Sequence, residues 1–61
     1  MKVQVFELAD GDRFIWKGRG YTVCSGPIED DTMYVIEDGV DGIQRFNPYC
    51  EVEKVIQVIL P

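Results

Sequence analysis

The side chains best suited to chemistry lie in one stretch, Gly11–Val23, which reads GDRFIWKGRGYTV. It contains the only Trp of the chain and three of its six basic residues, with Lys17 and Arg19 on either side of a glycine. Cations beside aromatic rings suit a phosphate-bearing base or an acidic peptide, through stacking and charge-assisted hydrogen bonds. The residues expected to form this binding face are Trp16, Lys17, Arg19, Tyr21, Arg45 and Phe46.

A structural role is the alternative for the same residues. In that interpretation Phe14 and Trp16 fill the interior of a small barrel, Tyr21 packs across a hairpin, and Lys17 and Arg19 are solvated. The sequence leaves both interpretations open, because an aromatic residue can line a core or a binding face.

Carboxylates form a second candidate surface. Three adjacent acids follow Ile28 in a predicted surface loop, and three more lie in the turn region Glu37–Gly42. Such a surface could imitate a row of phosphates and attract a basic protein partner, or it could serve solubility alone. The residues expected in this acidic contact surface are Glu29, Asp30, Asp31, Glu37, Asp38 and Asp41.

The sequence indicates neither catalysis nor metal binding. The chain has no His, and no activating base is evident for Cys24 or Cys50, which we expect to be core thiols. The acidic turns at Asp10–Asp12 and Glu37–Gly42 lack the spacing of a calcium-binding loop, and Asp-Gly is common turn chemistry. No phosphate-binding glycine motif is present. We therefore expect no enzyme activity, no metal and no cofactor.

Length and charge restrict the class of protein further. The 61 residues predict a single domain, 1–61, and an apolar fraction of 46% suits a folded chain. The net charge of −5 argues against non-specific nucleic-acid binding and against an anionic membrane surface. Glu7 and Asp10 interrupt any signal-like apolar run near the start, so we expect a cytoplasmic protein.

Alternating, β-branched and aromatic runs separated by turn residues predict an all-β domain. The glycines at Gly18 and Gly20 are expected to serve a tight hairpin turn, and a loop is expected at Gly26–Asp31. The last run, Glu51–Leu60, could also form a short helix, but its β-branched residues favour a strand. The expected strands are Lys2–Leu8, Arg13–Lys17, Tyr21–Ser25, Thr32–Glu37, Ile43–Phe46 and Glu51–Leu60.

Five to six short antiparallel strands predict a small barrel or a strongly bent sheet, and an SH3-like barrel fits the order of elements best. Pro48 cannot donate to a ladder, so we expect a 3₁₀ turn at Asn47–Cys50. An uncovered edge strand could pair with another copy, which leaves a homodimer or higher oligomer open.

The pattern E-L-x-x-G-D-x-F-x-x-x-G-x-x-Y-x-V, followed by a closing strand at Glu51–Val55, resembles small uncharacterised proteins of bacteriophages and prophages. It is carried by Glu7, Leu8, Gly11, Asp12, Phe14, Gly18, Tyr21 and Val23. The resemblance implies an SH3-like barrel without catalytic residues. It also implies action by binding in the host cytoplasm, either by blocking a host protein or by sequestering a signalling nucleotide.

Three functions follow as expectations. The first is a non-catalytic binding module that inhibits or modulates a host defence or nucleic-acid-processing protein by direct contact. The second is an oligomeric nucleotide-binding protein that uses Lys17, Arg19, Tyr21 and Arg45. The third is a structural or adaptor piece of a virion.

Overall fold

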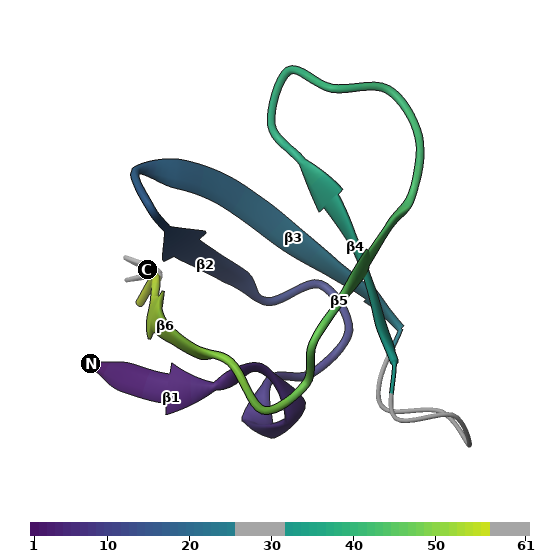
Figure 1. The fold of residues 1–61 in the computed structure, drawn as a ribbon. Helices are drawn as coiled ribbons and strands as arrows, with labels where there is room; N and C mark the ends of the chain where they lie inside the picture. Colours follow the sequence, from purple (N-terminus) through teal and green to yellow (C-terminus); the bar gives the residue numbers. More distant parts are fainter. Residues whose placement is uncertain (26–31, 57–61) are drawn as a thin grey trace, which may run out of the picture.

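The computed structural model describes residues 1–25 and 32–56, and this part of the chain is all-β (Figure 1). It contains six antiparallel strands in one sheet and a single 3₁₀ turn, which confirms the predicted fold class and strand number. The strands are β1 (Lys2–Gln4), β2 (Arg13–Trp16), β3 (Arg19–Ser25), β4 (Met33–Glu37), β5 (Gln44–Phe46) and β6 (Glu51–Lys54), and the turn is η1 (Val5–Glu7). Neither described range contains a helix of the length and hydropathy needed to cross a membrane. The loop predicted at Gly26–Asp31 and the last residues of the predicted final strand lie outside the described residues.

The sheet is bent so strongly that its two ends approach each other. Its strand order is β1-β6-β2-β3-β4-β5, so β5 forms one edge while β6 lies next to the other. Only Asn47–Cys50 connects β5 to β6, and Figure 1 shows the chain passing beside η1 on this path. A connection this short cannot join opposite ends of a flat sheet.

The sheet does not close into the expected barrel, because β1 and β5 are not paired with each other. The gap is bridged by turns instead. The backbone N–H of Val5 donates to the carbonyl of Cys50 at 3.1 Å, and that of Phe6 donates to the carbonyl of Pro48 at 2.9 Å. Since η1 and the Asn47–Cys50 turn supply these hydrogen bonds, two strand edges remain.

The single 3₁₀ turn lies at Val5–Glu7, not at Asn47–Cys50 as predicted. The carboxylate of Glu7 accepts a hydrogen bond from the backbone N–H of Gln4 at 2.8 Å, and this bond ends the predicted first strand early. The chain then turns inward and buries Val5. At Asn47–Cys50, the side chain of Asn47 instead accepts from the backbone N–H of Tyr49 at 2.8 Å, which closes an Asx-type turn.

The core lies on the concave face of the bent sheet. The alternation predicted in β2 is confirmed, because Phe14 is fully buried while Ile15 is 43% exposed. Val3, Trp16, Phe46 and Cys50 are partly buried against this core. The buried apolar residues are Val5, Leu8, Phe14, Tyr21, Val23, Met33, Val35 and Val52.

The hairpin between β2 and β3 turns at Lys17 and Gly18, whose φ angles of 50° and 77° match a type I′ turn. The predicted second turn glycine, Gly20, lies within β3 instead. A Cβ atom at Gly20 would collide with the carboxylate of Asp38, which forms an ion pair with Arg13 across this point. Gly20 is therefore needed for close approach and not for the turn.

Candidate functional site

Four aromatic rings meet where the bent sheet brings β5 against the β2–β3 hairpin. The rings of Phe14 and Tyr21, paired across β2 and β3, stack with centroids 5.1 Å apart. The ring of Phe46 reaches from β5 to the rings of Trp16 and Phe14, each at a centroid distance of 5.2 Å. Because β5 and β2 are not neighbours in the sheet, these contacts cross its interior. Edge-to-face aromatic pairs of this kind favour a defined relative orientation.

The cluster changes from core to surface along its length. Phe14 and Tyr21 are buried, whereas Trp16 and Phe46 are half-buried and open onto a groove of about 250 Å³. We call this hollow the aromatic groove. It is lined by Trp16, Tyr21, Gln44, Arg45, Phe46, Asn47 and Cys50. Trp16 therefore supports the core with one part of its ring and presents another part at the surface.

A cation lies at the hairpin end of the aromatic groove. The Nζ atom of Lys17 is 4.7 Å from the centroid of the Trp16 ring, within the range of a cation–π contact. The left-handed backbone at Lys17 belongs to the type I′ turn, and the side chain is exposed. The ammonium group thus lies against a ring that lines the groove, while Lys17 itself is not one of the lining residues.

Glu37 holds the buried wall of the aromatic groove in place. Its carboxylate accepts from the guanidinium of Arg19 at 3.0 Å and from the side-chain amide of Gln44 at 3.4 Å. Tyr21 lies opposite Glu37 in the β3–β4 register. Burial raises the pKa of Tyr21 above its ordinary value of 10.0, and the neighbouring Glu37 charge raises it further. The hydrogen bond to Glu37 fixes Gln44, which lines the groove beside Tyr21.

The structure brings together four of the six predicted binding-face residues. Trp16, Tyr21 and Phe46 form the apolar wall, and Lys17 contacts the Trp16 ring. Arg19 lies on the same face, but its guanidinium is paired with Glu37.

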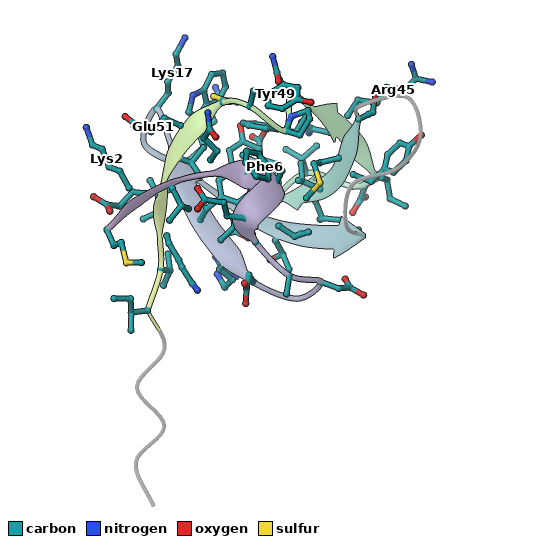
Figure 2. The ribbon with its side chains drawn as sticks, turned by 90° about the horizontal axis from the view of Figure 1, so that it is seen from below. Lys2, Phe6, Lys17, Arg45, Tyr49 and Glu51 are labelled. Carbon is teal, nitrogen blue, oxygen red and sulfur yellow. The ribbon has the colours of Figure 1, made fainter. Side chains whose placement is uncertain are left out.

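Arg45 borders the aromatic groove, but its side chain leaves β5 toward the opposite face from that of Phe46. The pairing of β4 with β5 places Arg45 opposite Tyr34, on the convex face of the sheet, while Phe46 lies opposite the buried Met33. Figure 2 shows the Arg45 side chain extending away from the body of the molecule. Adjacent strand residues alternate between faces, so Arg45 and Phe46 cannot both point into the groove.

Gln44, Asn47 and Cys50 also line the aromatic groove but were not predicted. Gln44 shares the parity of Phe46 in β5, so strand alternation alone could have placed it there. Asn47 and Cys50 lie in the turn after β5, and their positions follow from the bend of the sheet, which local sequence does not encode.

The predicted acidic surface is only partly described. Glu29, Asp30 and Asp31 lie outside the described residues. Glu37 is buried and hydrogen-bonded, and the carboxylate of Asp38 is paired with Arg13. Asp41 is exposed. Two carboxylates of the second acidic turn are thus neutralised within the molecule, which weakens their contribution to an external acidic surface.

Cys24 and Cys50 are unpaired, half-buried thiols. Within residues 1–25 and 32–56, no group of three or more His, Cys, Asp or Glu side chains is arranged to hold a metal ion. No protein-family model, curated protein sequence or solved structure matches this chain. Arguments about function therefore depend on the geometry of the aromatic groove.

Proposed function

We propose that this chain is a non-catalytic binding module that acts by direct protein–protein contact through the aromatic groove. One observation carries the proposal: the half-buried rings of Trp16 and Phe46 open onto a surface groove whose wall is fixed by the buried Glu37. Aromatic residues with partly exposed faces supply much of the binding energy at protein interfaces. A wall held by hydrogen bonds loses little side-chain entropy when a partner binds.

The small-ligand alternative has less support. A hollow of about 250 Å³ is below the usual range for small-molecule pockets, roughly 300–1,000 Å³. Of the cations expected to hold a nucleotide, Arg19 is paired with Glu37 and Arg45 points to the other face. Lys17 contacts the Trp16 ring without lining the groove, which leaves Arg45 as the one charged residue among the lining residues described.

The partner that we propose is a host protein of a defence or nucleic-acid-processing system. This choice depends on the resemblance to phage proteins carried by residues such as Glu7, Gly11 and Tyr21. The overall charge of −5 favours association with a protein whose surrounding surface is basic, while the groove itself takes an apolar side chain.

Affinity capture from bacterial lysate with groove variants tests this proposal. Lys17→Glu changes the charge beside the Trp16 ring, and Trp16→Leu removes the aromatic wall. Lys2→Glu is the matched control, because it makes the same change of charge on β1, outside the aromatic groove. The melting temperature of each variant confirms that it is folded.

A partner retained by the wild type and by Lys2→Glu, and lost by both groove variants, supports the proposal. Calorimetry with the purified partner should then give a stoichiometric complex. Equal capture by all four proteins, or capture of no protein, would exclude the aromatic groove as the contact site. Thermal stabilisation by a nucleotide in the absence of any protein partner would favour the small-ligand alternative.

A further inference from the structure

A second hollow adjoins the aromatic groove. It measures about 380 Å³ and is lined by Thr32, Arg45, Phe46, Asn47 and Tyr49, and we call it the Tyr49 hollow. It shares Arg45, Phe46 and Asn47 with the aromatic groove. The two hollows therefore form one continuous track past the end of β5. Figure 2 shows Lys17, Tyr49 and Arg45 along one margin of the molecule.

The lining of this track locates it at the edge of β5. Arg45 and Phe46 are adjacent in the strand and point to opposite faces of the sheet, yet both line both hollows. A hollow over one face of a strand would be lined by residues of one parity only. The track consequently lies beside the strand. Thr32, directly before β4, places part of the Tyr49 hollow at the end of the β4–β5 pair. The aromatic groove lies on the other side of β5, toward Trp16 and Tyr21, where the described residues supply no neighbouring strand.

Apolar surface accompanies this edge. Ile43, directly before β5, is 66% exposed, and Tyr49, two residues after Asn47, is 57% exposed. Phe6 contacts the Tyr49 ring edge-to-face at 5.8 Å and is itself exposed. Exposed apolar side chains gathered at an unpaired strand edge are features of a protein-binding surface.

The charges at the track differ from those of the whole chain. Its described lining contains one charged residue, Arg45, and no carboxylate, and Lys17 lies at its hairpin end. The chain as a whole carries −5. A segment that follows this edge meets Lys17 near its hairpin end and Arg45 where the two hollows join, so carboxylates on the segment would be attracted.

We propose that the track binds an extended acidic–apolar segment of the partner protein as an additional strand on the free edge of β5. This inference rests on the proposed function and specifies the form of the ligand. An added strand would pair its backbone with alternate residues of β5. An apolar side chain would enter the aromatic groove between Trp16 and Phe46, and the next side chain of the same parity would lie against Tyr49. One carboxylate of the segment would face Lys17 near the hairpin end, and another would face Arg45 where the two hollows join.

Selection of random linear peptides on the immobilised full chain tests this inference. We expect enriched sequences with apolar residues at alternate positions and acidic residues beside them. Binding of an enriched peptide to ¹⁵N-labelled protein should shift the amide signals of Gln44–Asn47 and the indole signal of Trp16. Lys17→Glu should weaken the affinity about fivefold, the effect of reversing one surface ion pair, while Lys2→Glu should leave it nearly unchanged.

Backbone pairing is tested on the peptide, so that the fold of the protein is not disturbed. Methylation of single backbone nitrogens should abolish binding at alternate positions and be tolerated at the positions between them, since only alternate N–H groups face β5. Tolerance at every position, enrichment of basic peptides, or shifts elsewhere in the protein would overturn the inference.

If no peptide is enriched while a groove-dependent protein complex is still captured, this inference fails and the proposed function stands. If the complex is absent as well, both fail. A sedimentation profile that depends on protein concentration, with β5 amides shifted on self-association, would identify a second copy of the chain as the occupant instead.

Discussion

Replacing Glu37 with leucine and with glutamine tests whether its carboxylate fixes the wall of the aromatic groove. Glu37 is buried, its carboxylate accepts hydrogen bonds from Arg19 and Gln44, and Tyr21 lies opposite it in the neighbouring strand. Leucine has a similar size but accepts no hydrogen bond, so Glu37→Leu leaves the side chains of Arg19 and Gln44 without this acceptor. Glutamine keeps one acceptor oxygen and removes the charge, so Glu37→Gln separates hydrogen bonding from ion pairing.

The structure determines the relative size of these effects. The half-buried side-chain amide of Gln44 loses its acceptor, and a donor left without one inside a protein costs about 1–3 kcal/mol. The side chain of Arg19 is 68% exposed, so its bond to Glu37 is largely screened and contributes at most about 1 kcal/mol. Glu37→Leu should therefore destabilise the protein by about 1–4 kcal/mol, and Glu37→Gln by about 1 kcal/mol or less. A domain of this length has a total stability of only about 3–9 kcal/mol.

Urea unfolding followed by Trp16 fluorescence measures both changes, since Trp16 lies beside Tyr21 with ring centroids 6.5 Å apart. The Gln44→Met variant completes a double-mutant cycle with Glu37→Leu. If Gln44 carries most of the effect, the two changes should be coupled by about 1 kcal/mol. Additive changes in the free energy of unfolding, or a Glu37→Leu variant as stable as the wild type, would refute the reasoning. The second outcome would mean that the polar cluster does not stabilise the fold, since such clusters can then be replaced by apolar groups without loss of stability.

Three further predictions concern the frame around the aromatic groove. Lys17→Asn should stabilise the protein by about 0.5–1 kcal/mol, because asparagine tolerates the φ of 50° in the type I′ turn better than lysine; an unchanged or lower urea midpoint would contradict this. Gly20→Ala should displace the Asp38 carboxylate and lower the free energy of unfolding by about 1 kcal/mol. The loss should be smaller when Asp38 is also replaced by alanine, and a second double-mutant cycle measures this difference. The raised pKa of Tyr21 means that the folded state holds the hydroxyl proton more tightly than the unfolded state does. The free energy of unfolding should therefore be unaffected by this group below pH 10.0 and should fall as the pH rises above it. Thermal melts over a pH series should show a smaller alkaline loss of stability for Tyr21→Phe than for the wild type.

Local sequence was sufficient for the strands and for most of their faces. Burial alternates with a period of two residues, so the pattern of β2 placed Phe14 inside and Ile15 outside without knowledge of its neighbours. β-Branched runs and glycine-containing turns likewise predicted six strands. The predicted first strand was too long, because the hydrogen bond from Gln4 to Glu7 competes with the ladder and starts η1.

The aromatic groove depends on the tertiary structure and could not be predicted from local sequence. Trp16 and Phe46 are far apart in the chain and lie on strands that do not pair, so their contact depends on the bend of the whole sheet. The role of Glu37 depends in the same way on the register that places it beside Tyr21. The different positions of Arg45 and Phe46 also depend on register, because the pairing of β5 with β4 sets Phe46 on the core side and leaves Arg45 at the border of the groove. Residue types and alternation are local properties of the chain, whereas the approach of β5 to the β2–β3 hairpin depends on non-local pairing, and only the folded sheet determines it.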